Sequence, residues 1–325
     1  MAIRLDLAQE EAEDHLKDQI AEQDAKFRAF GRIGDLVRLR DLRVRAGLAQ
    51  IHGGAASVLQ GSFATPPLSD ADKDGAVPEV NMAALDLRAL RAGLDRDGAV
   101  ILRNAIPLRR SLDLRKLFDA ALSAGRELLD LEDQDLPDIR HTDSKEMFNL
   151  VPEKIALPTH AARAFLGDRN MLATFMSPRI AFEWIDILTA QGFRAMVQHL
   201  LQDDVRFGFD RCLIRRVHGQ DPSPDWAHGA GETGRGLLLW VPLADCGGDT
   251  QRPGLDIARP STTRLAGEAS ALSRPFIAAG DAVLIRNTKI ISKSFGAHFT
   301  HDTIAVETCF LGRSRVRLSD LPVFW

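Results

Sequence analysis

Short apolar segments, each bounded by glycine, proline or aspartate, dominate the chain from residue 205 onward. They are rich in branched and aromatic residues and lie at 205–217, 236–243, 280–285, 289–294 and 303–311. Short apolar strands of this kind become buried only when they pair into sheets and the apolar face of one sheet packs against another layer. The pattern therefore predicts a β-sandwich or a small β-barrel in this part of the chain.

The chain before residue 205 has helical periodicity instead. Apolar residues recur at roughly helical spacing between residues 5 and 50, and Gly31 and Gly34 are predicted to divide this stretch into two helices. Further helices are predicted at 81–96, 108–130 and 181–201. Several helices followed by several strands indicate an α+β fold, in which helices cover one side of a jelly roll.

Loop-forming residues separate the first helices from the rest of the chain. The stretch opens with Gly53 and Gly54 and contains Pro66 and Pro67. We expect a helical N-terminal extension, a linker and a single jelly-roll domain, at 1–52, 53–80 and 81–325 respectively. The N-terminal helices are expected to pack on this domain, and they are also the candidate contact for a homo-oligomer.

Charge and composition argue against several classes of protein. The net charge is −4, whereas a general nucleic-acid binder would usually be basic. No apolar run reaches membrane-spanning length and the first residues lack the apolar core of a signal peptide, so we expect no membrane partner and a cytoplasmic location. The cysteines, three in number and far apart, fit buried thiols better than a disulfide framework.

The segment from Gly236 to Ile257 carries the strongest resemblance to a known family. It reads Gly-Leu-Leu-Leu-Trp-Val-Pro-Leu-Ala-Asp-Cys-Gly-Gly-Asp-Thr-Gln-Arg-Pro-Gly-Leu-Asp-Ile. With the strand at 303–311 and the closing segment at 318–325, it resembles the phytanoyl-CoA dioxygenase-like family of the Fe(II)/2-oxoglutarate oxygenase superfamily. The resemblance extends over about residues 90–325. It implies a double-stranded β-helix, the cupin-like jelly roll in which those enzymes hold iron and 2-oxoglutarate.

The resemblance also indicates where the first iron ligands should be. In that family iron is held by two histidines and one carboxylate, and the first two ligands come as His-x-Asp. The motif aligns with His228 and Ala230, so the carboxylate position holds alanine. In the register one residue earlier, the two positions are Ala227 and Gly229. Neither alignment supplies a carboxylate, and only His228 remains as a candidate metal ligand.

The other elements of the family's site are also replaced. The second histidine aligns with Ile291, after the strand at 280–285. The arginine that binds the far carboxylate of 2-oxoglutarate, a bidentate contact suited to a guanidinium, aligns with Thr303. The resemblance therefore implies a degenerate site that has lost its carboxylate, its second histidine and its cofactor-binding arginine.

The leading hypothesis is a pseudo-oxygenase that needs no cofactor. Such a protein would bind a small organic ligand, or it would be an enzyme that performs non-oxidative chemistry on a small organic substrate in the former iron pocket. Its catalytic residues are unknown. The residues expected to line the pocket are Arg215, Trp226, Ala230, Trp240 and Ile291.

The alternative hypothesis is an active oxygenase with a rearranged site. His-x-Ala in place of His-x-Asp resembles the related halogenases, where chloride takes the position of the missing carboxylate, and His228 fits that pattern. His298 or His301 would then supply a second ligand for Fe(II), with 2-oxoglutarate as cosubstrate in a hydroxylase or halogenase. The competing interpretation of His298 and His301 is that they are solvated loop residues.

Overall fold

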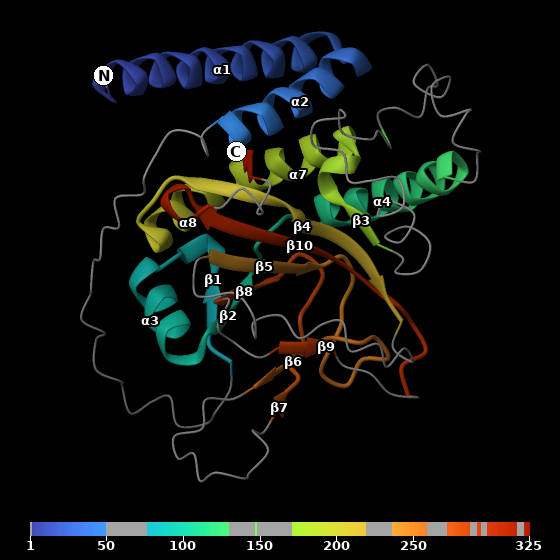
Figure 1. Cartoon of the computed structure of the whole chain (residues 1–325). Helices are drawn as coiled ribbons and strands as arrows, with labels where there is room; N and C mark the ends of the chain where they lie inside the picture. The colour runs from blue at the N-terminus through green and yellow to red at the C-terminus, as the bar shows by residue number, and fades with distance from the viewer. Residues whose placement is uncertain are drawn as a thin grey trace.

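The computed structural model describes most of the chain and shows a mixed α and β fold (Figure 1). The described residues are 2–49, 77–129, 147, 171–218, 236–258, 272–286, 291–293, 298–316 and 322–325. Within these ranges the chain forms six α-helices and two β-sheets. None of the helices in these ranges combines the length and the apolar character needed to cross a membrane.

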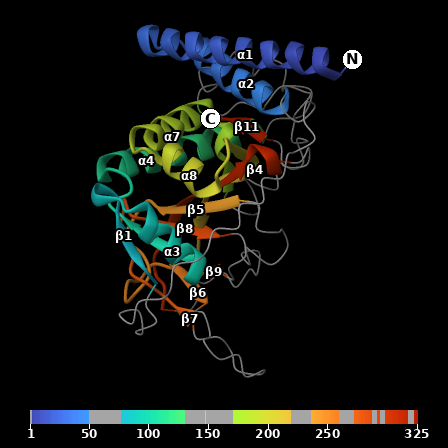
Figure 2. The same cartoon turned by 90° about the vertical axis from the view of Figure 1, so that its left-hand side faces the viewer.

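The first two helices form a hairpin that lies across one end of the molecule (Figures 1 and 2). Helix α1 spans Ala2–Phe30 and helix α2 spans Ile33–Ala49, so the predicted division near Gly31 is confirmed. Gly31 has a φ of +63°, a conformation that glycine adopts without steric cost. The hairpin packs on the rest of the chain through a small apolar cluster, whose buried members are Ile20, Leu39, Leu42, Ala46 and Phe324.

Helix α3 spans Leu87–Asp97 and begins later than the predicted helix at 81–96. The Asp86 carboxylate caps it by accepting from the backbone N–H groups of Arg88 and Ala89. The residues before it form a short strand and one turn of 3₁₀-helix instead. Helix α4 spans Leu108–Leu129 and confirms the helix predicted there.

The predicted helix at 181–201 is two helices. Helix α7 spans Pro178–Ala190, with the Ser177 hydroxyl as its N-terminal cap, and helix α8 spans Phe193–Leu201. Gly192 lies between them with a φ of +72°, which ends one helix and starts the next at a new angle. Apolar periodicity continues across this break, so the sequence pattern does not reveal it.

The large sheet contains eight strands, most of them antiparallel. Along its main path the order is β1-β2-β8-β5-β10-β4-β11, and β3 also pairs with β4. The strands are β1 Glu79–Asn81, β2 Ala99–Arg103, β3 Met171–Ala173, β4 Val205–Val217, β5 Gly236–Pro242, β8 Ala282–Arg286, β10 Thr303–Gly312 and β11 Pro322–Phe324. The strands predicted at 205–217, 236–243, 280–285 and 303–311 are therefore confirmed as β4, β5, β8 and β10.

A second, three-stranded sheet has the order β7-β6-β9. Its strands are β6 Leu255–Ala258, β7 Leu272–Ser273 and β9 Ile291–Lys293, the last of which confirms the strand predicted at 289–294. The chain alternates between the sheets, because β5, β8 and β10 belong to the large sheet while β6, β7 and β9 belong to the small one. Figure 1 shows the small sheet on one side of the large sheet and helices α4 and α7 on the other.

The large sheet buries apolar side chains on both of its faces. One face packs against the helices, where Phe175, Phe207 and Phe310 belong to the main apolar core. The other face turns toward the small sheet, and a separate cluster joins Trp240 of the large sheet to Ile257 of the small one. The space between the two sheets is therefore an interior, and side chains that face it are candidates for a binding site.

A single methyl group added at Gly47 should destabilise the contact between α2 and β11. A Cβ at this position would lie 2.0 Å from the carbonyl oxygen of Pro322, which is backbone and cannot rotate away. We expect Gly47→Ala to lower the free energy of unfolding by about 1–3 kcal/mol, as overpacked cores do. Gly34→Ala on the same helix is the matched control, because its Cβ meets nothing within 4 Å, and it should be neutral or slightly stabilising. Urea denaturation of both variants checks this, and an unchanged Gly47→Ala would mean that α2 does not lie against β11.

Candidate functional site

The interior face of β10 carries polar residues. Because side chains alternate along a strand, Thr303, Ala305, Glu307 and Cys309 share one face. Ala305 belongs to the apolar cluster between the two sheets, which identifies that face as the interior one. Thr303, Glu307 and Cys309 are at most 3% exposed. A threonine and a glutamate are thus buried between the sheets, where an apolar residue would ordinarily be expected.

A buried ion pair joins β4 to β10 in this interior. Arg215 is the register partner of Ala305, so its side chain lies on the interior face as well. Its Nε lies 2.8 Å from Oε1 of Glu307, and its Nη2 donates to Oε2 at 3.4 Å. The Nε–H is poorly aligned with Oε1, so that contact is ionic rather than a well-formed hydrogen bond. The side chains of Arg215 and Glu307 are 12% and 2% exposed, and the pair carries no net charge.

Trp240 lies beside this pair on the neighbouring strand. It is the register partner of Glu307 across β5 and β10, and it is 2% exposed. Its indole Nε1 is buried and has no acceptor among the described residues. Buried indole N–H groups usually have a hydrogen-bond partner. Trp240 therefore presents a buried donor whose desolvation no described acceptor offsets.

Thr303 occupies the position where the family resemblance expects an arginine. Its hydroxyl donates to the backbone carbonyl of Pro253 at 2.6 Å, and its side chain is buried. A hydroxyl that is already engaged offers neither the charge nor the two parallel donors with which an arginine binds a carboxylate. The side chain at this position instead joins β10 to the segment that precedes β6 by a hydrogen bond.

The structure places some of the other predicted pocket residues. Ile291 is the first residue of β9 and the register partner of Ile257, so it lies in the small sheet. Trp226, His228 and Ala230 belong to 219–235, which lies outside the described residues. Of the predicted pocket, Arg215 and Trp240 are therefore together on the interior face, and Ile291 is on the sheet opposite.

His298 and His301 lie in the turn before β10, and both are exposed. The His298 ring contacts that of Phe299, with 4.0 Å between ring centroids, and the His301 backbone N–H donates to the Gln251 carbonyl. Within the described ranges, no group of three histidine, cysteine, aspartate or glutamate side chains is arranged to hold a metal ion. The described side chains therefore do not fit an iron and 2-oxoglutarate centre, which needs converging imidazoles, a carboxylate and a cationic anchor.

Other charged and nucleophilic residues near the interior have structural partners. Arg216 points to the opposite face of β4 and binds Asp119 of α4 at 2.5 Å. Asp256 of β6 accepts from Arg274 Nε at 2.9 Å. The three cysteines are buried and form no disulfide bond, and burial raises the pKa of the Cys246 thiol. Cys246 is therefore a neutral thiol at physiological pH, unsuited to act as a nucleophile.

Comparison with known proteins finds similar solved structures, all with low sequence identity to this chain. The chain matches no protein-family model and no curated protein sequence. The solved structures that it is similar to include the non-haem α-ketoglutarate-dependent epimerase SnoN from nogalamycin biosynthesis, at 13% identity over 70% of this chain and 82% of that chain, with a TM-score of 0.41. They also include the non-haem monooxygenase ThoJ in a nickel complex, at 15% identity over 70% of this chain and 77% of that chain, with a TM-score of 0.43. A third is EctD from S. alaskensis with 2-oxoglutarate and 5-hydroxyectoine, at 15% identity over 71% of this chain and 77% of that chain, with a TM-score of 0.42.

Proposed function

We propose that the chain is a jelly-roll protein of the phytanoyl-CoA dioxygenase-like kind that binds a small organic ligand between its sheets without iron or 2-oxoglutarate. The observation that carries the proposal is Thr303, whose hydroxyl is used by Pro253 at the position of the cofactor-binding arginine. The carboxylate and second histidine positions of the family pattern, Ala230 and Ile291, also lack metal-binding side chains. Three separate losses in one frame support a change of function rather than a single exchanged ligand.

The order of the strands supports the jelly-roll part of this proposal. In a jelly roll the chain passes back and forth between two facing sheets, so strands that are adjacent in a sheet are distant in sequence. Here β5 lies between β8 and β10, and β6 pairs with β9 although β7 and β8 come between them in the sequence. The apolar cluster that joins Trp240 to Ile257 gives the two sheets a common interior.

The chemistry of the interior indicates the class of ligand. Arg215 and Glu307 neutralise each other, so an anion would have to displace Glu307 from the guanidinium in order to bind there. Trp240 adds a buried donor, and its surroundings in the cluster are apolar. A neutral molecule with an apolar body and one acceptor atom, such as an amide, a ketone or an ether, fits these groups best.

An anaerobic titration of the purified protein with Fe(II) and 2-oxoglutarate tests the absence of iron chemistry. We expect no visible charge-transfer band and no stoichiometric iron, because Ala230, Ile291 and Thr303 stand where the family pattern has its carboxylate, its second histidine and its arginine. A band with about one iron per chain would overturn the proposal in favour of an active hydroxylase or halogenase. His228 with His298 or His301 would then be the ligands to replace first.

A thermal-shift screen with neutral amides, ketones and ethers tests the binding part. Compounds that raise the Tm of the wild-type protein should lose most of this effect in Trp240→Phe, which keeps an aromatic ring and removes the indole N–H. A missing hydrogen bond of this kind lowers affinity by about 5- to 10-fold. Compounds that stabilise both proteins equally would show that Trp240 does not contact the ligand.

A further inference from the structure

The α1–α2 hairpin is held together by contacts of its own. The side-chain amide of Gln23 on α1 donates to the carboxylate of Asp35 on α2 at 2.8 Å and to its backbone carbonyl at 3.2 Å. Ile20 of α1 packs in one apolar cluster with Leu39 and Leu42 of α2. Because these contacts join the two helices to each other, they do not depend on the attachment of the hairpin to the rest of the chain.

A limited set of contacts attaches the hairpin to the rest of the chain. Helix α2 lies against α7 and β11, and its Val44 belongs to the main apolar core. From α1, the ring of Phe27 packs edge-on against Phe182 of α7, with 4.7 Å between the ring centroids. Arg28 binds Asp186 of α7 at 2.8 Å, an ion pair that solvent screens because the side chains are 51% and 24% exposed. This attachment is small beside the ladders that join the strands of the large sheet.

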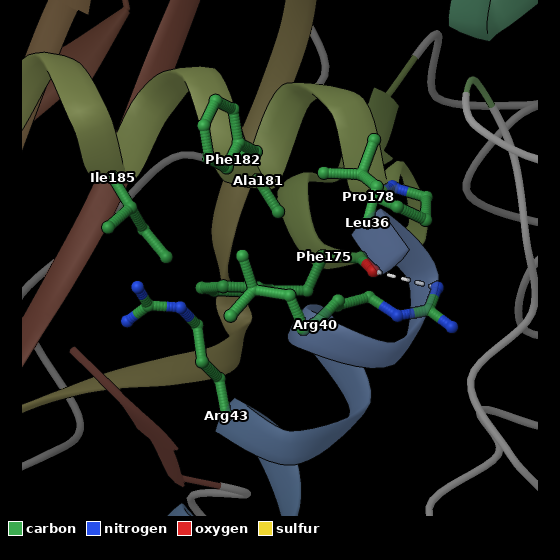
Figure 3. A pocket seen from close by; sticks show the side chains of 9 residues that line it. Leu36, Arg40, Arg43, Phe175, Pro178, Ala181, Phe182 and Ile185 are labelled. Atoms are coloured by element: carbon green, nitrogen blue, oxygen red, sulfur yellow. Dashed lines mark hydrogen bonds between the residues drawn. The ribbon is translucent and has the colours of Figure 1, made fainter. Parts of the chain in front are cut away.

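The contact between α2 and α7 also leaves a gap (Figure 3). Counted out to its open mouth the gap holds about 230 Å³, and its enclosed part has room for about one water molecule. Its apolar lining includes Leu36 and Leu39 from α2 and Ala181, Phe182 and Ile185 from α7. Side chains beside a gap lose the dispersion contacts that close packing would give them. This contact therefore stabilises the attachment less than a close-packed contact between the same residues.

Arg43 of α2 weakens the attachment further. Figure 3 shows its guanidinium near Ile185 of α7. The residue as a whole is half-buried, but its Nη1 is enclosed and has no hydrogen-bond partner among the described residues. Burial lowers the pKa of Arg43 to about 10, an effect that Arg194 of α8 strengthens and Asp24 of α1 opposes. At neutral pH Arg43 is charged whether or not the hairpin is attached, so departure of α2 relieves both the enclosed donor and the repulsion from Arg194.

The connection between the hairpin and the rest of the chain is long. It comprises residues 50–76, which lie outside the described residues. A segment of about 27 residues can span about 90 Å when extended, so the hairpin can move away without breaking a strand. We propose that the α1–α2 hairpin detaches from α7 and β11 as one unit while both sheets stay folded. Detachment uncovers the apolar side of α7, so the hairpin is a removable cover over that helix and acts apart from the ligand site between the sheets.

Amide hydrogen exchange of the full chain in low concentrations of urea, followed by mass spectrometry, tests the proposal. We expect residues 15–30 of α1 and 33–49 of α2 to share one opening equilibrium. This equilibrium should favour the open form at least about 10-fold more than that of β10 does, because units with few contacts to the rest of a fold open first. Equal protection of the hairpin and β10 would overturn the proposal, as would different opening equilibria for α1 and α2.

Phe27→Ala shows whether the hairpin moves as a unit. The ring of Phe27 contacts α7, so its removal from α1 should speed the exchange of α1 and α2 alike, by at least about 10-fold, and leave β10 unchanged. Equal acceleration in β10 would show that the hairpin opens only when the whole chain unfolds. Acceleration confined to α1 would equally contradict the proposal.

Arg43→Met should have the opposite effect. It removes the enclosed donor and the charge that faces Arg194, so exchange of the hairpin should slow by about 5- to 10-fold. Arg45→Met is the matched control, because Arg45 is an exposed arginine on the same helix, and this variant should exchange as the wild type does. Faster exchange of the hairpin in Arg43→Met would mean that Arg43 strengthens the attachment, contrary to the proposal.

Discussion

Replacing Glu307 with leucine should be among the most damaging single changes in the chain. The substitution leaves the Arg215 guanidinium between the sheets without the carboxylate that lies 2.8 Å from its Nε. Removing one partner of a buried pair costs far more than the pair contributes, because the remaining charge stays desolvated. We expect the free energy of unfolding to fall by about 3–5 kcal/mol. Urea denaturation measures this directly.

Two comparison variants separate this effect from ordinary loss of packing. The double variant Arg215→Met with Glu307→Leu removes both charges, and it should recover most of the lost stability because an apolar pair of similar size fills the site. Asp119→Asn removes the partner of the neighbouring Arg216, an exposed pair, and should cost less than about 1 kcal/mol. A double variant as unstable as Glu307→Leu alone would show that the charges are not the reason.

Replacing Trp325 with alanine should be similarly destabilising, for a reason of shape rather than charge. The Trp325 ring is buried and packs against Phe207 and Phe310, with ring centroids 4.7 and 5.4 Å away. Loss of a buried tryptophan leaves a large cavity at the junction of β4, β10 and β11. We expect the free energy of unfolding to fall by about 3–5 kcal/mol, measured by chemical denaturation.

The indole N–H of Trp325 contributes a smaller part, and a second variant isolates it. Trp325 Nε1 donates to Oγ1 of Thr189 at 3.1 Å. Thr189→Val removes this acceptor and leaves the ring stack intact, so it should cost about 1 kcal/mol. If Thr189→Val were as destabilising as Trp325→Ala, the hydrogen bond rather than the stacking would hold this residue.

The long periodic elements of the fold could be predicted from the sequence, and the breaks within them could not. The hairpin of α1 and α2 and the strands β4, β5, β8 and β10 follow from apolar spacing and turn residues. The division of α7 from α8 depends on the positive φ of Gly192, which apolar periodicity does not encode. Strands β1, β3 and β11 have three residues each, too few to show an alternating pattern.

The candidate site was predictable as a set of residue types but not as a set of contacts. Glu307 is the one acidic residue of β10, and Arg215 is one of four arginines in β4, yet only the register of the two strands makes them partners. The engagement of Thr303 by Pro253 is equally a matter of tertiary structure.

The contact between α2 and β11 has a consequence for how the chain is made. Helix α2 ends at Ala49, and the strand that it packs against begins at Pro322. Ribosomes synthesise the chain from its N-terminus, so Leu39, Leu42 and Ala46 must wait for Phe324 before their cluster can close. Closing a contact between such distant segments is slow, and an apolar helix face left open in the meantime invites association with other chains. During translation this hairpin therefore keeps an apolar face open until β11 has been synthesised.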